Sequence, residues 1–292
     1  MTKRIFALIS VLLILFSFAA CKKNKTKDIE VIKGGSVSES GESGKSSQGS
    51  SGIVLDPFKG LDITITGISP FCQVSLNTSE CDPEVQEKVK FSADKDRYAN
   101  GEKATITASL STANGGYTLA SETKQFDISN IPEYITSVEG LNLDSLKKER
   151  DDFVTAQCAE AIGGTHLMDA YALHGFTIAE VTGKTFVGTY MVSLKANKRS
   201  LFPDSAKNKV YNKVCFIYRF SCKSEYGTTA NIYTCVCAEN VVKYPDGTLK
   251  WGTSSADALD FSTASSYNST DEVIASNITS WSDSYDIKEI KN

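Results

Sequence analysis

The stretch YNKVCFIYRFSCK (211–223), followed by NIYTCVCAENVVKY (231–244), decides the fold of the C-terminal half of this chain. Apolar side chains alternate with small or polar ones in both stretches, which is the period of two typical of β-strands with one buried face. Matching the apolar faces across a turn centred near Tyr226 sets Cys215 opposite Cys237. The sequence therefore predicts an antiparallel hairpin with these two cysteines on the outer face of a sheet.

Further elements of the same half precede and follow this hairpin. Residues 143–162 carry apolar side chains at helical spacing, interrupted by Arg150 and Gln157, and residues 186–196 and 248–252 have strand character. We therefore expect one helix packed on an antiparallel sheet, in a domain of residues 138–292. The order of these elements resembles the cystatin-like or nuclear-transport-factor-like α+β layout, and that resemblance implies a cupped sheet.

Short strands dominate the residues before this domain. LDITITGI (61–68) alternates strictly, and three more segments with β-branched and aromatic bias follow at short spacing, at 89–93, 102–110 and 117–128. Several short strands without a long helix predict a small β-sandwich over residues 55–137. The segment DRYANGEKATITA (96–108) resembles the strand opening of bacterial immunoglobulin-like repeats, which implies an immunoglobulin-like fold. The predicted fold class is thus mainly β with α+β.

The first 20 residues read as a signal peptide. Lys3 and Arg4 precede the uncharged run IFALISVLLILFSFAA (5–20), which ends at Cys21 behind two alanines. The run resembles the lipobox of bacterial lipoproteins, although Phe18 stands where leucine is usual. That resemblance implies cleavage before Cys21 and lipidation of its sulfur, so that the protein is held on the extracytoplasmic face of the cell membrane. An uncleaved membrane anchor is the alternative.

A disordered tether should separate this lipid anchor from the folded part. KGGSVSESGESGKSSQGSSG (33–52) is almost entirely glycine, serine and charge, so it buries too little apolar surface to order itself. We assign residues 21–54 to the lipidated cysteine and its tether.

Charge and cysteine content narrow the function classes. The 272 residues from Cys21 onward hold 29 basic and 35 acidic residues, a net charge of −6 without a basic cluster on the folded part, so we expect no nucleic-acid partner. Seven cysteines remain after Cys21, and outside the cytoplasm they favour disulfides. We expect bridges Cys72–Cys81 and Cys158–Cys222, with the latter joining helix to sheet. Cys215 and Cys237 form a third candidate pair, which leaves Cys235 as the unpaired thiol.

Residues that could carry chemistry are few. His166, His174 and Asp169 match no zinc-binding spacing, and the acids near Asn100 do not match a calcium-binding loop, so no metal, cofactor or catalytic residue is predicted. Exposed aromatic side chains bind sugars and peptides well. On this basis we name three candidate ligand-binding residues, Tyr233, Trp251 and Trp281.

The whole chain resembles uncharacterised surface lipoproteins of Gram-positive bacteria, a resemblance in architecture that implies no known activity. The first hypothesis is a membrane-anchored binding or interaction module for a glycan, a peptide or an envelope protein. The alternatives are a hydrolase-like extracytoplasmic enzyme and a structural component of an envelope complex. A pocket with converging acids or histidines would favour the enzyme, whereas an exposed aromatic patch would favour the binding module.

Overall fold

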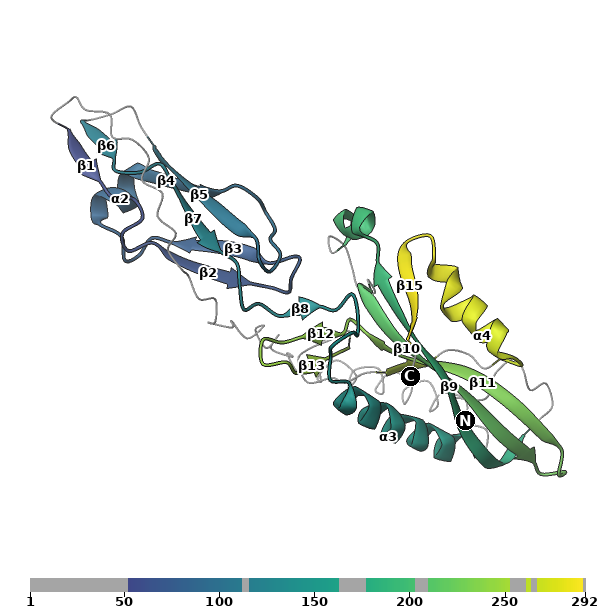
Figure 1. Ribbon diagram of the computed structural model, residues 1–292. Helices are drawn as coiled ribbons and strands as arrows, with labels where there is room; N and C mark the ends of the chain where they lie inside the picture. The colour runs from purple at the N-terminus through teal and green to yellow at the C-terminus, as the bar shows by residue number, and fades with distance from the viewer. Residues whose placement is uncertain are drawn as a thin grey trace, which may run out of the picture. The chain divides into compact units, whose positions relative to one another are not determined.

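Antiparallel strands form most of the fold (Figure 1), in a computed structural model that describes residues 52–111, 116–162, 177–202, 210–252, 261–263 and 267–290. The predicted fold class, mainly β with α+β, is confirmed. In the described ranges every helix is too short or too polar to cross a membrane.

Short strands build the N-terminal part. Its elements are β1 (Ile53–Leu55), β2 (Asp62–Thr66), β3 (Gln73–Asn77), α2 (Pro83–Lys88), β4 (Val89–Ala93), β5 (Lys103–Leu110), β6 (Tyr117–Leu119) and β7 (Thr123–Asp127). The β2-β3 hairpin and the β4-β5-β7 sheet bury a common hydrophobic cluster that includes Ile65, Ile106 and Phe126. Two sheets therefore pack face to face, as the predicted sandwich requires. The predicted strand 117–128 is divided into β6 and β7.

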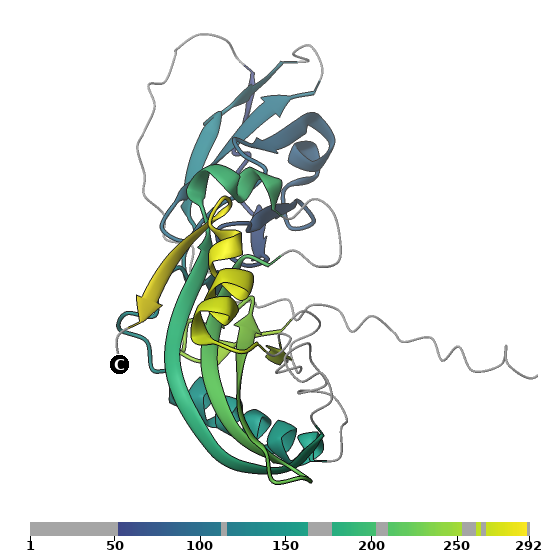
Figure 2. The ribbon, with the colours of Figure 1, turned by 90° about the vertical axis from the view of Figure 1, so that its right-hand side faces the viewer.

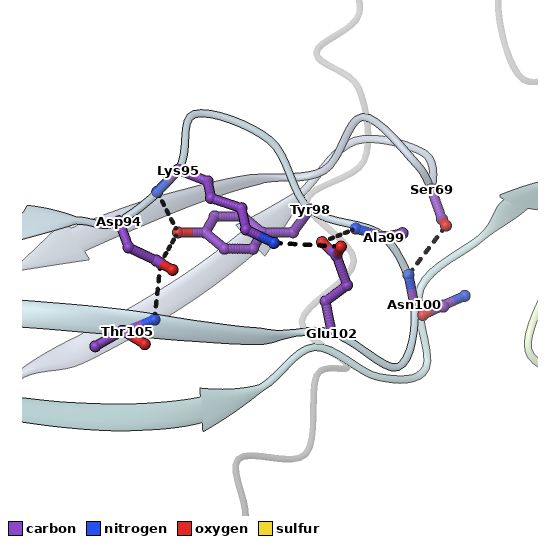
Figure 3. A network of polar contacts seen from close by, with 8 residues as sticks. All are labelled: Ser69, Asp94, Lys95, Tyr98, Ala99, Asn100, Glu102 and Thr105. Atoms are coloured by element: carbon purple, nitrogen blue, oxygen red, sulfur yellow. Dashed lines mark hydrogen bonds and ion pairs between the residues drawn. The ribbon is translucent and has the colours of Figure 1, made fainter. Parts of the chain in front are cut away.

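The motif DRYANGEKATITA forms a structural hydrogen-bond network (Figure 3). The hydroxyl of Tyr98, whose side chain is buried, donates to Asp94 Oδ1 at 2.7 Å, and the Thr105 N–H donates to the same oxygen at 2.9 Å. The Glu102 carboxylate accepts from the Ala99 N–H at 3.0 Å. The hydrogen bond from Tyr98 lowers the pKa of Asp94, while burial and that bond raise the pKa of Tyr98 to about 12. These hydrogen bonds join neighbouring segments of the sandwich, so the motif stabilises the fold.

The segment after the sandwich pairs with strands far along the chain. Strand β8 (Glu133–Tyr134) joins β12 (Val242–Lys243) and β13 (Leu249–Lys250) in a small sheet. The ring of Tyr211 contacts Phe71 at 5.7 Å and Tyr134 at 4.7 Å between centroids. Residues on both sides of the predicted boundary near residue 137 thus share contacts, and independent folding of residues 55–137 stays a prediction.

The C-terminal part is a five-stranded sheet between helices. Its remaining elements are α3 (Asp144–Ala161), β9 (Ile178–Leu194), η2 (Ala196–Leu201), β10 (Asn212–Ser224), β11 (Thr229–Glu239), β14 (Phe261–Thr263), α4 (Thr270–Asn277), η3 (Thr279–Trp281) and β15 (Tyr285–Ile290). The strand order is β14-β11-β10-β9-β15. The helix predicted over 143–162 is confirmed as α3.

Two strand predictions in this half need correction. The predicted strand 231–244 ends at Glu239, because Asn240 adopts a left-handed backbone with φ of 52° that interrupts the ladder. The predicted strand 248–252 forms β13, which pairs with β12 and does not enter the large sheet. The outer strands of that sheet are instead β14 and β15.

Both faces of the sheet are covered, with α3 and α4 on opposite sides (Figures 1 and 2). Val214, Phe216 and Phe220 pack in a cluster with residues of α3, as their alternation predicts. The predicted register is also confirmed, because Cys215 pairs with Cys237. The outer face, however, is not exposed: Cys215 and Ile217 pack in a second cluster with Val273 of α4. The sheet is therefore the middle of three layers.

Arg150 interrupts the apolar stripe of α3 because it binds aromatic rings. Its side chain is 10 % exposed, and its guanidinium lies 4.8 Å from the ring centroid of Phe216 and 5.1 Å from that of Phe186. The guanidinium also donates two hydrogen bonds to Asp151 Oδ1. A cation stacked on aromatic faces packs as part of the core while keeping an ionic partner.

Candidate functional site

Three cysteine thiols meet on the sheet face covered by α4. Cys215 comes from β10, and Cys235 and Cys237 come from alternate positions of β11, so all three side chains point to the same face. Their sulfur atoms all lie within 4.8 Å of one another, and all three residues are buried. The Cys237 Sγ is 3.0 Å from that of Cys215 and 3.4 Å from that of Cys235. We call this group the thiol cluster.

The cover of the thiol cluster is α4, an element that the sequence analysis missed. Ser269 caps the helix by accepting from the Glu272 N–H at 3.2 Å, and Glu272 in turn accepts from the Asn268 N–H at 3.0 Å. This Ser-x-x-Glu pattern is a helix-start signal that the sequence offers. Val273 and Ile278 are fully buried against the thiols. The cluster therefore lies in an apolar layer.

A buried ion pair lies beside the thiol cluster on the same strands. Lys213 Nζ is 2.7 Å from Glu239 Oε1, and the two side chains are 11 % and 16 % exposed. The ammonium also lies 4.0 Å from the ring centroid of Trp281. Lys213 pairs with Glu239, and Cys215 pairs with Cys237 two residues away on the same strands. The ammonium is therefore near the sulfurs.

The thiols of the cluster titrate differently from one another. Hydrogen bonding to Cys235 and Cys237, together with burial, raises the pKa of Cys215. Hydrogen bonding with Cys215 and Cys235, and then the charge of Lys213, lowers the pKa of Cys237. One sulfur of the three is thus favoured as a thiolate.

A groove opens between α3 and β9 on the other face of the sheet. It has a volume of about 290 Å³ and is lined by Thr155, Cys158, Ala159, Ile162, Val181, Thr182, Gly183 and Lys184. Ile162 is 52 % exposed at its rim. Lys184 Nζ donates to Thr155 Oγ1 at 3.2 Å, so one cation and two hydroxyls lie among apolar side chains. A small ligand with an apolar body and a polar group matches this lining.

The structure brings some of the predicted disulfide partners together and not others. Cys158 and Cys222 lie in the same hydrophobic cluster under α3, and both are thiols. Burial raises the pKa of Cys222 to about 11. Cys72 and Cys81 do not meet, since they pack in different clusters. The five residues of β3 between them span about 17 Å, and the turn from Thr78 to Cys81 is too short to bring the Cα atoms back within the roughly 7 Å of a bridge; both residues are thiols. The predicted Cys72–Cys81 bridge is therefore not formed.

The three aromatic residues proposed for ligand binding do not form one surface. Trp251 is 4 % exposed and lies in the cluster with α3, so its proposed surface role is incorrect. Tyr233 and Trp281 are half-buried on the opposite face, beside α4. The sequence could not reveal these positions, because an aromatic residue in a polar neighbourhood fits a core as well as a surface. Cys21, His166, Asp169 and His174 lie outside the described residues.

Comparison of the chain with protein-family models, with curated proteins and with solved structures gives no match.

Proposed function

We propose that this protein is a lipid-anchored binding module on the extracytoplasmic face of the cell membrane. The support for the anchor is the uncharged run 5–20, which follows a basic start and stops at Cys21. A flexible tether of the length from Cys21 to Asp56 reaches about 30–35 Å, so the folded part would meet a partner away from the lipid headgroups.

The observation that carries the binding role is the groove between α3 and β9. Its lining combines the apolar side chains of Ile162 and Val181 with the cation of Lys184. We infer a ligand with an apolar body and an anionic group, because the body can cover the apolar side chains while the anion pairs with the ammonium. The described groove residues include no carboxylate or histidine that could act as a general base. The apolar lining with a single cation is what supports binding.

The anchor makes a direct prediction. Replacing Cys21 by serine should move the protein from the membrane fraction to the soluble fraction and abolish uptake of labelled palmitate. The Lys22→Ser variant is the control, because it changes the neighbouring residue and keeps the acceptor sulfur. A Cys21→Ser variant that stays on membranes, beside a wild type that takes up no label, would show that the anchor is a helix.

The groove makes a second prediction. The full-length protein in detergent is screened against a glycan array and a library of peptides that end in a carboxylate. We expect the hits to lose at least about tenfold in affinity in Ala159→Trp, which fills the groove, and in Lys184→Met, which removes the charge. Ala156→Trp is the matched control, because Ala156 is exposed on the same helix and outside the groove lining. Equal affinity for the Ala159→Trp and Ala156→Trp variants would contradict the proposed site.

A further inference from the structure

We propose that Cys215, Cys235 and Cys237 bind one thiophilic d10 metal ion, either Zn²⁺ or Cu⁺. Three sulfur atoms converge from two neighbouring strands, and each residue is buried at 6 % exposure or less. Soft sulfur ligands select these two ions among the common biological metals. This site lies on the sheet face opposite the groove under α3, so it is independent of the proposed binding function.

The spacing of the sulfurs fits a shared ion after a small adjustment. With a metal–sulfur bond of about 2.3 Å, three ligands of one ion lie about 3.8–4.0 Å apart. The observed separations of 3.0 Å and 3.4 Å are somewhat shorter than this range, and the third pair lies within 4.8 Å. The two short contacts must therefore lengthen by about 0.4–1.0 Å when the ion binds, while the strands stay paired at Cys215 and Cys237.

The arrangement is better suited to a metal ion than to a disulfide. A Cys215–Cys237 bridge would use two sulfurs and leave Cys235 buried 3.4 Å from the bridge. A metal ion would engage all three, and its positive charge would balance the thiolates that a buried apolar layer otherwise disfavours. The ammonium of Lys213, on the same strand face, adds to this balance.

Zn²⁺ and Cu⁺ differ in the number of ligands that each requires. In the described part of the chain, the group that converges on one point contains three ligands. A structural zinc ion is almost always bound by four ligands in a tetrahedron, so zinc would need one more ligand such as water. Cu⁺ accepts three sulfur ligands without a fourth. Separate titrations with the two ions therefore distinguish the alternatives.

The test uses the full-length protein, reduced and kept free of oxygen. We titrate Zn²⁺ and Cu⁺ separately against a competing chelator, and we follow Co²⁺ as a spectroscopic substitute for zinc. The expected result is one equivalent of at least one ion, with thiolate charge-transfer absorption and protection of all three cysteines from alkylation. Cys235→Ala should weaken binding at least about 100-fold, whereas Cys222→Ala, which removes a buried thiol from the opposite face, should leave it unchanged.

Three results would overturn the proposal. One is the absence of stoichiometric uptake of either ion by the reduced protein. Another is equal affinity in Cys235→Ala and Cys222→Ala, with circular dichroism showing that both variants are folded. The third is a Cys215–Cys237 disulfide in the protein as isolated, recovered by peptide mapping, together with no metal uptake after reduction.

Discussion

Replacing Asn212 by leucine should lower the free energy of unfolding of the C-terminal part by about 3–6 kcal/mol, because three buried backbone groups each lose a hydrogen bond and only the Val241 carbonyl keeps another, from the Ile135 N–H. Asn212 is fully buried at the start of β10. Its amide nitrogen donates to the carbonyl oxygens of Ile135 and Val241, each at 2.8 Å, and its Oδ1 accepts from the Val241 N–H at 2.6 Å. The Asn212 side chain thus hydrogen-bonds β10 to Ile135, which precedes α3, and to Val241, which follows β11.

The measurement is denaturant unfolding followed by tryptophan fluorescence. Both tryptophans of the chain, Trp251 and Trp281, belong to the C-terminal part, so their signal reports on it. Asn231→Leu is the matched control: Asn231 is exposed on β11 and accepts a single hydrogen bond, from Ser221 Oγ at 2.9 Å. We expect the control to change stability by less than about 1 kcal/mol. A similar loss in the two variants would refute the role assigned to Asn212.

Alternation in the sequence was enough to predict the central hairpin, because side chains of a strand alternate between faces and the turn near Tyr226 sets the pairing. The pairing of Cys215 with Cys237 follows from those two facts alone. The same reasoning failed on the outer face. Cysteine and isoleucine at alternate positions suit a second buried face as well as an outer one, and only the element that covers them decides between the two.

Tertiary partners explain the other errors. The eight residues between Cys72 and Cys81 suggested a closed loop, but they contain β3, whose extension depends on pairing with β2. The strand predicted over 231–244 breaks at Asn240, whose side chain accepts from the Tyr211 N–H at 2.8 Å. Long-range contacts of this kind leave no local pattern in the sequence. The thiol cluster could be predicted only in part, since alternation placed its three cysteines on one face without showing that α4 buries them.

Removing one partner of the buried ion pair between Lys213 and Glu239 should strongly lower the free energy of unfolding. Replacing Glu239 by leucine leaves an ammonium that is 11 % exposed without its carboxylate, and we expect a loss of about 3–5 kcal/mol at pH 7. The comparison variant is Asp152→Leu, which removes an ion pair with Lys148 of nearly the same length, 2.8 Å, whose side chains are 77 % and 69 % exposed. There we expect a much smaller loss, because solvent screens an exposed pair.

The pH dependence of this effect has a definite sign. Burial acts to lower the pKa of Lys213, but the hydrogen bond and charge of Glu239 outweigh it, so the pKa in the folded protein lies above its ordinary value of 10.5. The pair therefore contributes fully at neutral pH, and its contribution is lost as the pH rises through that raised value. In Glu239→Leu the hydrogen bond and charge of Glu239 are gone, and burial is opposed only by the charges of Cys237 and Cys215, so Lys213 should release its proton at a lower pH than in the wild type. The stability difference between the two proteins should then shrink from pH 7 to pH 10.

The double variant Lys213→Met/Glu239→Leu tests whether the loss comes from the unpaired charge or from the missing side chain. Because it removes both charges and keeps the volume apolar, we expect it to recover most of the stability that Glu239→Leu loses. Unfolding followed by tryptophan fluorescence at pH 7 and pH 10 measures all four proteins. If Glu239→Leu loses no more stability than Asp152→Leu, or if the double variant is as unstable as Glu239→Leu, an unpaired buried ammonium is not the cause.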